Sequence, residues 1–242
     1  MSNADLHLSS HISKQFNAEL DDIRQRVLTM GGLVEQQVSE AVRALTEADG
    51  ELGQQVANRD YKVNAMEVGI DEECIRVLAR RQPAATDLRL IMAVVKTITD
   101  LERIGDEAEK IGRMAASLAA NPTPAGSLSP VETMGRRVSS MVHRVLDAFA
   151  RLDAEDALEI AKEDRKVDSE YDAISRQCLT FMLEDPRTIR PVMDLQWAAR
   201  ALERIGDHAS NIGEYVIYLI QGKDVRHTSL AQMEAELEAR NG

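Results

Sequence analysis

Aromatic and turn-forming residues are scarce in this sequence. Of 242 residues only 3% are Phe, Trp or Tyr, and there are 13 Gly and 6 Pro. Ala, Leu, Glu, Arg and Val dominate instead, and these residues favour helices that pack through aliphatic side chains. Few segments have the pattern of a β-strand. The composition therefore predicts an all-α protein, and the chain is long enough to bury a substantial core.

Long apolar runs and a secretory signal are also lacking. The longest apolar run near the end, Tyr215 to Ile220, is far shorter than the roughly 20 residues that span a bilayer. The first eight residues contain no basic region followed by an apolar one. We therefore expect a cytoplasmic protein that reaches a membrane only through its partners. Cys74 and Cys178 have apolar helical neighbours and are expected to be buried thiols rather than a disulfide.

Positive charge is in deficit. The chain has 29 Lys and Arg against 41 Asp and Glu, which gives a net charge of −12. Nucleic acids are polyanions, so this balance argues against them as partners and is compatible with cations or basic protein surfaces.

Apolar residues recur at three- and four-residue steps along six stretches, the period of amphipathic helices. Residues 121–130 are rich in Pro, Gly and Ser, and they predict a linker between the third and fourth stretch. We expect a first three-helix bundle over residues 10–120, a second over 131–221 and a polar tail over 222–242. The predicted helices are 10–49, 52–80, 86–119, 131–152, 154–183 and 191–220.

The two halves of the chain repeat one another. The hexapeptide Leu-Glu-Arg-Ile-Gly-Asp stands at residues 101–106 and again at 202–207, an offset of 101. Earlier positions match without gaps at an offset of 104, among them Lys62-Val63 with Lys166-Val167. An internal duplication accounts for both registers, and it predicts two tandem three-helix bundles.

Each hexapeptide places a Glu and an Asp four residues apart, on one side of a helix and beside its apolar seam. Glu109 continues that side in the first copy. The preceding helix of each half carries a second pair at the same spacing. Divalent cations prefer clustered oxygen ligands, and gathering carboxylates without a cation is electrostatically costly. The candidate metal ligands are Asp60, Asn64, Glu102 and Asp106 in the first half, and Asp164, Asp168, Glu203 and Asp207 in the second.

Surface ion pairs are the alternative explanation for these acids. Lys62, Arg103, Lys166 and Arg204 stand close enough in sequence to neutralise them. Such pairs contribute only about 0 to 1 kcal/mol each.

Glycines inside the motif helices also require an explanation. Gly105 and Gly112, like Gly206 and Gly213, lie one heptad apart. Each costs roughly 1 kcal/mol relative to Ala in a helix interior. We expect that a neighbouring helix approaches the backbone closely at these positions.

Catalytic patterns are weak, so we expect no enzyme. A ferritin-type di-iron site needs Glu-x-x-His, and the motif helices lack it. His208 follows Asp207 directly and is read as a helix-surface residue, while His7 and His11 have metal-like spacing but lie near the N-terminus. Serine elbows and phosphate-binding loops are absent from the sequence. A carboxylate metalloenzyme built on the same acids remains the alternative to a non-catalytic protein.

The sequence resembles the PhoU family of phosphate-transport-associated regulators. The resemblance rests on both hexapeptides and the Ile-Gly that follows each, on Met30-Gly31 with its repeat, on Lys62-Val63-Asn64 with Lys166-Val167-Asp168, and on the tandem layout. It implies two three-helix bundles whose Glu/Asp-x-x-x-Asp motifs hold mono- or multinuclear metal clusters at the eight candidate positions. The metal would be Mg, Mn, Fe or Zn, since oxygen-rich sites accept all four. Asn64 departs from the family pattern, so the first site should bind metal more weakly.

The resemblance also implies a function and partners. PhoU proteins restrain the phosphate-starvation response by coupling a phosphate ABC transporter, through its ATPase subunit, to a sensor histidine kinase. They act by protein contact, and the family leads us to expect a homodimer.

Overall fold

The computed structural model describes residues 14–121, 123–225, 228 and 232–235. These residues contain no strand, which confirms the predicted all-α class. The elements in chain order are α1 (Lys14–Thr46), α2 (Gly50–Ala57), α3 (Tyr61–Arg81), α4 (Ala85–Ala120), α5 (Leu128–Arg151), α6 (Ala154–Glu184), the 3₁₀ helix η1 (Pro186–Thr188) and α7 (Ile189–Gln221). No described helix combines the length and hydropathy of a membrane span.

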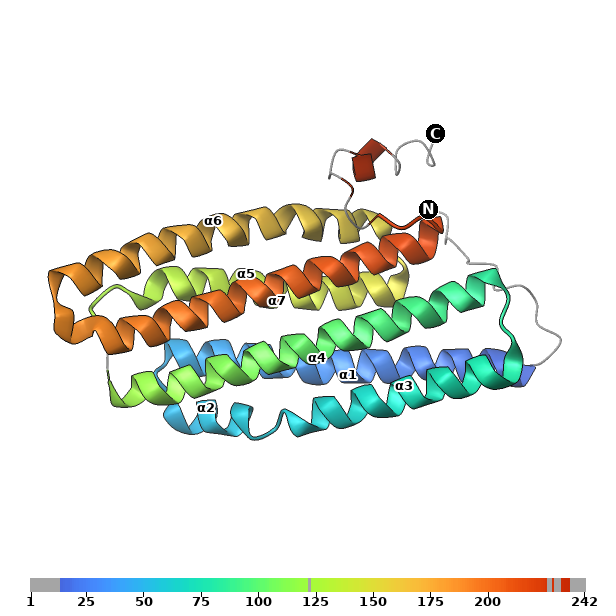
Figure 1. Ribbon diagram of the computed structural model, residues 1–242, viewed down its shortest axis with the longest axis horizontal. Helices are drawn as coiled ribbons and strands as arrows, with labels where there is room; N and C mark the ends of the chain where they lie inside the picture. Colours follow the sequence, from blue (N-terminus) through green and yellow to red (C-terminus); the bar gives the residue numbers. More distant parts are fainter. Residues whose placement is uncertain (1–13, 122, 226–227, 229–231, 236–242) are drawn as a thin grey trace.

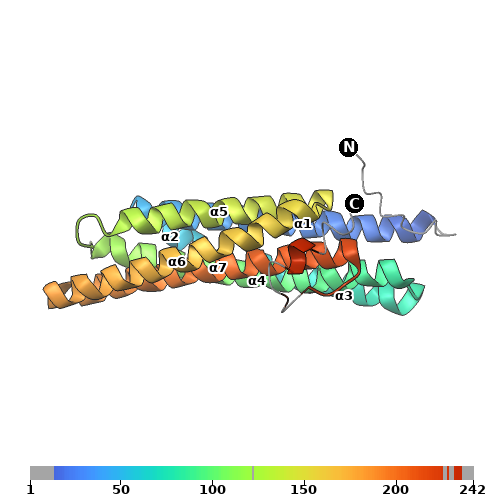
Figure 2. The same ribbon diagram turned by 90° about the horizontal axis from the view of Figure 1, so that it is seen from above.

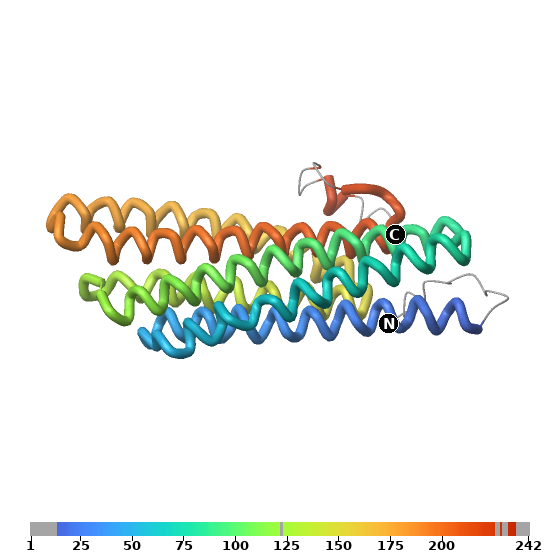
Figure 3. The backbone as a smooth tube through the Cα atoms, turned by 60° about the horizontal axis from the view of Figure 1, so that its bottom comes forward, coloured from blue at the N-terminus to red at the C-terminus, as the bar shows by residue number. Residues whose placement is uncertain are grey.

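The helices run along the long axis of an elongated molecule (Figures 1 and 2). The helices α4 and α7, which carry the repeated hexapeptide, lie side by side in the middle (Figure 3). Two side-chain contacts show that they are antiparallel. Ser117 Oγ donates to Asp194 Oδ2 at 2.7 Å, and Arg204 Nε lies 2.7 Å from Glu107 Oε1. The pairing of α4 with α7 therefore joins the two repeats.

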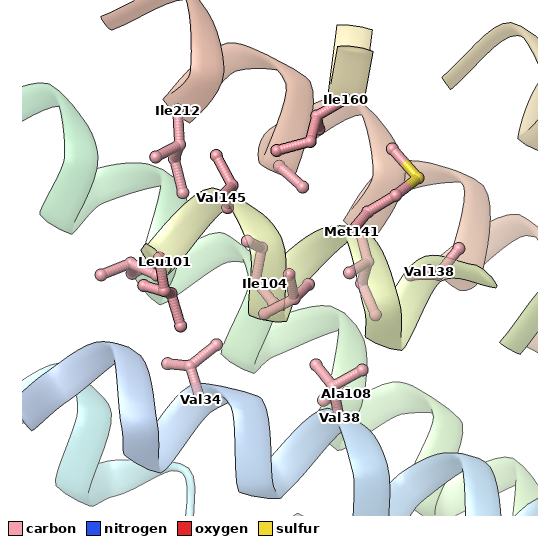
Figure 4. Close-up of a cluster of buried hydrophobic side chains, with 14 of the residues drawn as sticks. Val34, Val38, Leu101, Ile104, Ala108, Val138, Met141, Val145, Ile160 and Ile212 are labelled. Atoms are coloured by element: carbon pink, nitrogen blue, oxygen red, sulfur yellow. The ribbon is translucent and has the colours of Figure 1, made fainter. Parts of the chain in front are cut away.

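The repeats share one hydrophobic core. Figure 4 shows Val34 of α1, Leu101 and Ile104 of α4, Met141 of α5 and Ile212 of α7 in a single buried cluster. Buried apolar residues of all seven α-helices belong to that same cluster. One hydrophobic cluster therefore extends through both repeats.

The second predicted helix was wrong in one respect, because the chain breaks between α2 and α3 at residues 58–60. Arg59 N–H donates to Val56 O at 3.1 Å, an i to i−3 bond that tightens the end of α2. The equivalent helix α6 is continuous. The sequence differs at the contact with the next helix, where the first repeat has Gly53 and the second has Ala157.

The expected close approach of a neighbouring helix is confirmed at Gly112 and Gly213. A Cβ at Gly112 would lie 2.6 Å from Gly53 O, whereas one at Gly213 would lie 3.1 Å from Ala157 O. The backbone of α2 therefore lies closer to α4 than the backbone of α6 lies to α7. We attribute the break after α2 to this closer contact, since the chain must leave it to continue as α3.

The ends of the predicted segments also differ from the structure. The helix α5 begins at Leu128, so the last three residues of the predicted linker are helical. In the tail, Val225 and Met233 are buried and Glu234 pairs with Lys162, so this part packs on the protein. The predicted start of the first helix at residue 10 lies outside the described residues, as do His7 and His11. Cys74 and Cys178 are free and buried, as expected.

Candidate metal centres

Each repeat brings acidic side chains from two facing helices together. We call Asp164 and Asp168 of α6 with Glu203 and Asp207 of α7 the second acidic site. The first acidic site comprises Asp60 and Asn64, at the start of α3, with Glu102, Asp106 and Glu109 of α4.

The second acidic site contains three carboxylates in ligand geometry. Oxygen atoms of Asp168, Glu203 and Asp207 lie within 4.8 Å of one another. Glu203 is only 8% exposed, and Arg200 Nη1 donates to its Oε1 at 2.6 Å. Glu203 Oε2 and Asp164 Oδ1 are buried and have no hydrogen-bond partner among the described residues. Buried carboxylate oxygens without partners are costly, and a bound cation would satisfy them.

The repeated glycine of the hexapeptide makes room for these acids. A Cβ at Gly206 would lie 3.1 Å from Asp164 Oδ1, and one at Gly105 would lie 2.9 Å from Asp60 Oδ1. A neighbouring helix was expected to approach here, and the group of that helix that lies closest is a candidate ligand. Gly105 and Gly206 thus belong to the acidic sites themselves.

Electrostatic repulsion accumulates in the second acidic site. Burial, together with the charges of Asp207, Asp168, Glu203 and Glu214, raises the pKa of Asp164 to about 7. Burial also raises the pKa of Glu203 and of Asp207, and in both cases neighbouring carboxylates add to it. A cation among these groups would favour their charged forms.

The first acidic site is built differently. Oxygen atoms of Asp60, Asp106 and Glu109 lie within 4.8 Å of one another. Gln37 of α1 donates from Nε2 to Asp60 Oδ1 at 3.2 Å. Burial raises the pKa of Asp60, although the hydrogen bond from Gln37 opposes it. The amide oxygens of Gln37 and Asn64 are buried without a hydrogen-bond partner in the described structure.

The predicted ligands fall into two groups. Asp60 and Asp106 lie together in one site, and Asp168, Glu203 and Asp207 in the other. Glu102 and Asp164 lie outside these close groups of carboxylates, and Asn64, which offers an amide oxygen, forms a side-chain hydrogen bond with Asp60. The two carboxylates are still coupled to the sites, because burial and nearby acids raise the pKa of Glu102 and of Asp164.

Sequence reasoning missed Glu109 as a member of the first acidic site, and it missed Gln37, which donates to Asp60. Glu109 was placed on the correct side of its helix but not counted as a ligand, although Glu102, Asp106 and Glu109 follow the i, i+4, i+7 spacing of one helix face. Gln37 lies on another helix, and its spacing gave no indication of a role.

Two of the four cations named in the alternative explanation form their ion pairs with other acids. Lys166 Nζ lies 2.8 Å from Glu163, and Arg204 Nε lies 2.7 Å from Glu107. Arg200 pairs directly with Glu203 of the second acidic site, and the charge of Arg204 also opposes the raised pKa of Glu203 and Asp207. His208, expected on the surface, is buried instead, with its Nδ1 2.7 Å from Asp100 Oδ1. This contact also joins α4 to α7.

Comparisons with known proteins agree on one family. The model of the PhoU domain matches residues 27–115 and again residues 131–216. The phosphate-specific transport system accessory protein PhoU homolog of Pseudomonas aeruginosa is 54% identical over 97% of both chains. The phosphate-specific transport system accessory protein PhoU of Escherichia coli is 48% identical over 98% of both.

Solved structures give the same answer. The crystal structure of PhoU from Pseudomonas aeruginosa superposes with a TM-score of 0.84 at 54% identity, over 86% of this chain and all of that one. The phosphate transport system regulatory protein PhoU from Streptococcus pneumoniae gives a TM-score of 0.81 at 31% identity, over 87% of this chain and 99% of that one. The names describe accessory and regulatory proteins rather than enzymes, which counts against the metalloenzyme alternative. The chain belongs to the PhoU family.

Proposed function

We propose that this protein is a cytoplasmic regulator of phosphate transport that represses the phosphate-starvation response when phosphate is plentiful. The observation that carries the proposal is the 54% identity, over 97% of both chains, to a relative named as an accessory protein of the phosphate-specific transport system. Identity at this level over the full length supports a shared role in that system.

The proposed regulation works by contact with other proteins. The partners are the ATPase subunit of the phosphate ABC transporter and a sensor histidine kinase, and the protein acts as a homodimer. The length of the helices supports this role, since long helices offer extended docking surfaces (Figure 1).

The proposal includes a divalent metal ion, held most tightly in the second acidic site. Asp164, Asp168, Glu203 and Asp207 would be its ligands, and the unpartnered oxygens of Asp164 and Glu203 support this assignment. The ion would neutralise repelling carboxylates and so fasten α6 to α7. The first acidic site would hold its ion through Asp60, Asp106 and Glu109, more weakly because Asn64 contributes no charge.

Deleting the gene tests the regulatory role. In phosphate-rich medium the deletion strain should express phosphate-starvation genes, and the wild-type gene supplied in trans should restore repression. Expression is measured with a starvation-promoter reporter. Unaltered repression in the deletion strain would contradict the proposed function.

Elemental analysis tests the metal. Protein purified without chelators should contain a bound divalent metal, and Asp164→Asn/Asp207→Asn should lose most of it. Asp147→Asn, a change at an exposed carboxylate that pairs with Arg151, is the control and should retain metal. Equal metal content in all three proteins would exclude the second acidic site.

A further inference from the structure

A groove between α4, α6 and α7 lies beside the second acidic site and shares Arg200 with it, but none of the proposed metal ligands lines it. Its volume is about 400 Å³, within the range of protein binding sites. Trp197, the only tryptophan of the chain, lies in it with 59% of its surface exposed. The lining residues are Glu107, Lys110, Met114, Tyr171, Met193, Gln196, Trp197, Arg200, Ala201 and Arg204.

The rim of this groove is positive on an otherwise acidic protein. The side chains of Lys110, Arg200 and Arg204 are each about half exposed, at 50%, 52% and 48%. Glu107, which pairs with two of them, is only 4% exposed. Arg200 pairs with the buried Glu203, so solvent meets three cations above two buried carboxylates and the rim keeps one net positive charge, although the net charge of the chain is −12.

The floor is made of residues that suit a protein contact. Met114 and Met193 are flexible and adapt to different apolar surfaces. Tyr171 lies under Arg200, with the guanidinium 5.4 Å from the ring centroid. Trp, Tyr and Arg are the residues most often responsible for binding energy at protein interfaces.

The equivalent position in the first repeat holds a cation in place of the exposed aromatic ring. Lys96 stands where the second repeat has Trp197, and its ammonium lies 5.4 Å from the ring centroids of both Tyr215 and Tyr218. Lys96 therefore covers its aromatic neighbours within the protein. The second repeat exposes an aromatic ring at the corresponding place.

The positive charge of the groove rim indicates which kind of partner could bind there. A second copy docking through the same groove would bring two positive rims together, which is unfavourable. A helix with acidic residues beside an apolar face matches both rim and floor, and it would bind as a helix in a groove.

We propose that this groove docks an acidic amphipathic helix of a partner protein. An apolar side chain of that helix packs against Trp197 and Met193, while its carboxylates meet Lys110, Arg200 and Arg204. The groove thereby supplies the contact surface for the regulation described above, and the inference rests on that proposed function.

Selection from a displayed library of random 16-residue peptides tests the inference on the full-length protein. Selected peptides should be enriched in Asp and Glu next to large apolar residues at helical spacing. Their binding should change the fluorescence of Trp197, which reports on the groove without a label. Met193→Glu/Lys110→Glu should weaken binding on the order of tenfold or more, because it places acids in the groove.

A matched variant makes the same change of charge elsewhere. Met92→Glu/Arg136→Glu alters an exposed methionine of α4 and an exposed arginine of α5, and it should bind the peptides as the wild type does. Circular dichroism of both variants checks that they fold. The inference is overturned if no acidic peptide is selected, if the groove variant binds as well as the control, or if it alone abolishes self-association.

Failure of the groove and failure of the proposed function give different results. If the deletion derepresses the starvation genes but no acidic peptide is selected, the inference about the groove is wrong and the proposed function stands. If acidic peptides bind the groove but the deletion leaves repression unaltered, the proposed function is wrong. The groove then binds acidic helices without the regulatory role inferred for it.

Discussion

The two acidic sites contain the same six-residue motif, yet their surroundings make them chemically unlike. In the first repeat Glu109 is neutralised by Arg113, whose Nε donates to it at 3.0 Å. The equivalent positions in the second repeat are Ser210 and Glu214, and the charge of Glu214 adds to the repulsion on Asp164. The identical motif therefore does not determine the charge of the site, which is set by residues one and two turns away.

The packing of the repeats differs in the same way. Gly53 contacts Gly112 where α2 crosses α4, whereas Ala157 contacts Gly213 where α6 crosses α7. The first crossing is closer, and the helix that makes it ends at Ala57. The second repeat keeps one continuous helix, and both of its candidate ligands on α6 lie within it.

The glycine crossings should show the largest difference between the repeats. We expect Gly112→Ala to lower the free energy of unfolding by about 1 to 3 kcal/mol, because the new methyl group would collide with Gly53 O. Gly213→Ala should cost less than about 1 kcal/mol, since its contact is longer and the higher helix propensity of Ala offsets it. Urea denaturation measures both. Equal losses would mean that the two crossings do not differ.

Exchanging charges between the acidic sites should alter their metal affinities next. We expect Asn64→Asp/Arg113→Glu to strengthen metal binding at the first site on the order of tenfold, because both changes add negative charge there. Isothermal titration should be done in an Asp207→Asn background, so that the second site does not contribute. Glu214→Gln serves as the reverse test and should weaken the second site. Unchanged affinity in the first variant would show that the surrounding charge does not set the strength of the site.

The smallest difference is expected in how the stability of the metal-free protein depends on pH at each acidic site. Asp164 has a pKa raised from 3.8 to about 7, so its contribution to stability is present below pH 3.8 and is lost as the pH rises through 7. At pH 8, Asp164→Asn should therefore raise the free energy of unfolding of the protein from which a chelator has removed metal. The expected gain is on the order of 1 kcal/mol after discounting for partial exposure. Asp60→Asn should have less effect, since Asp60 accepts a hydrogen bond from Gln37. Urea denaturation at pH 5 and pH 8 measures the free energy of unfolding of both variants. The same change between the two pH values in both variants would contradict this prediction.

The helices and the flanks that carry acids could be predicted because both follow from the 3.6-residue period of a single helix. Glu203 and Asp207 lie where that period places them, beside a buried seam. The break after Ala57 could not be predicted in this way, since it depends on how closely two backbones meet. The participation of Gln37 and the burial of His208 against Asp100 also depend on contacts between helices distant in sequence.

The antiparallel pairing of α4 with α7 has the form of a contact between two copies related by a twofold axis, the commonest arrangement in homodimers. A single repeat would expose the face of α4 that α7 now covers, and it would be complete only as a pair. Fusion of two copies into one chain turns such an interface into an interior. Once joined, the halves no longer need to be self-complementary, so one could acquire Asn64 and Arg113 while the other acquired Asp168 and Glu214.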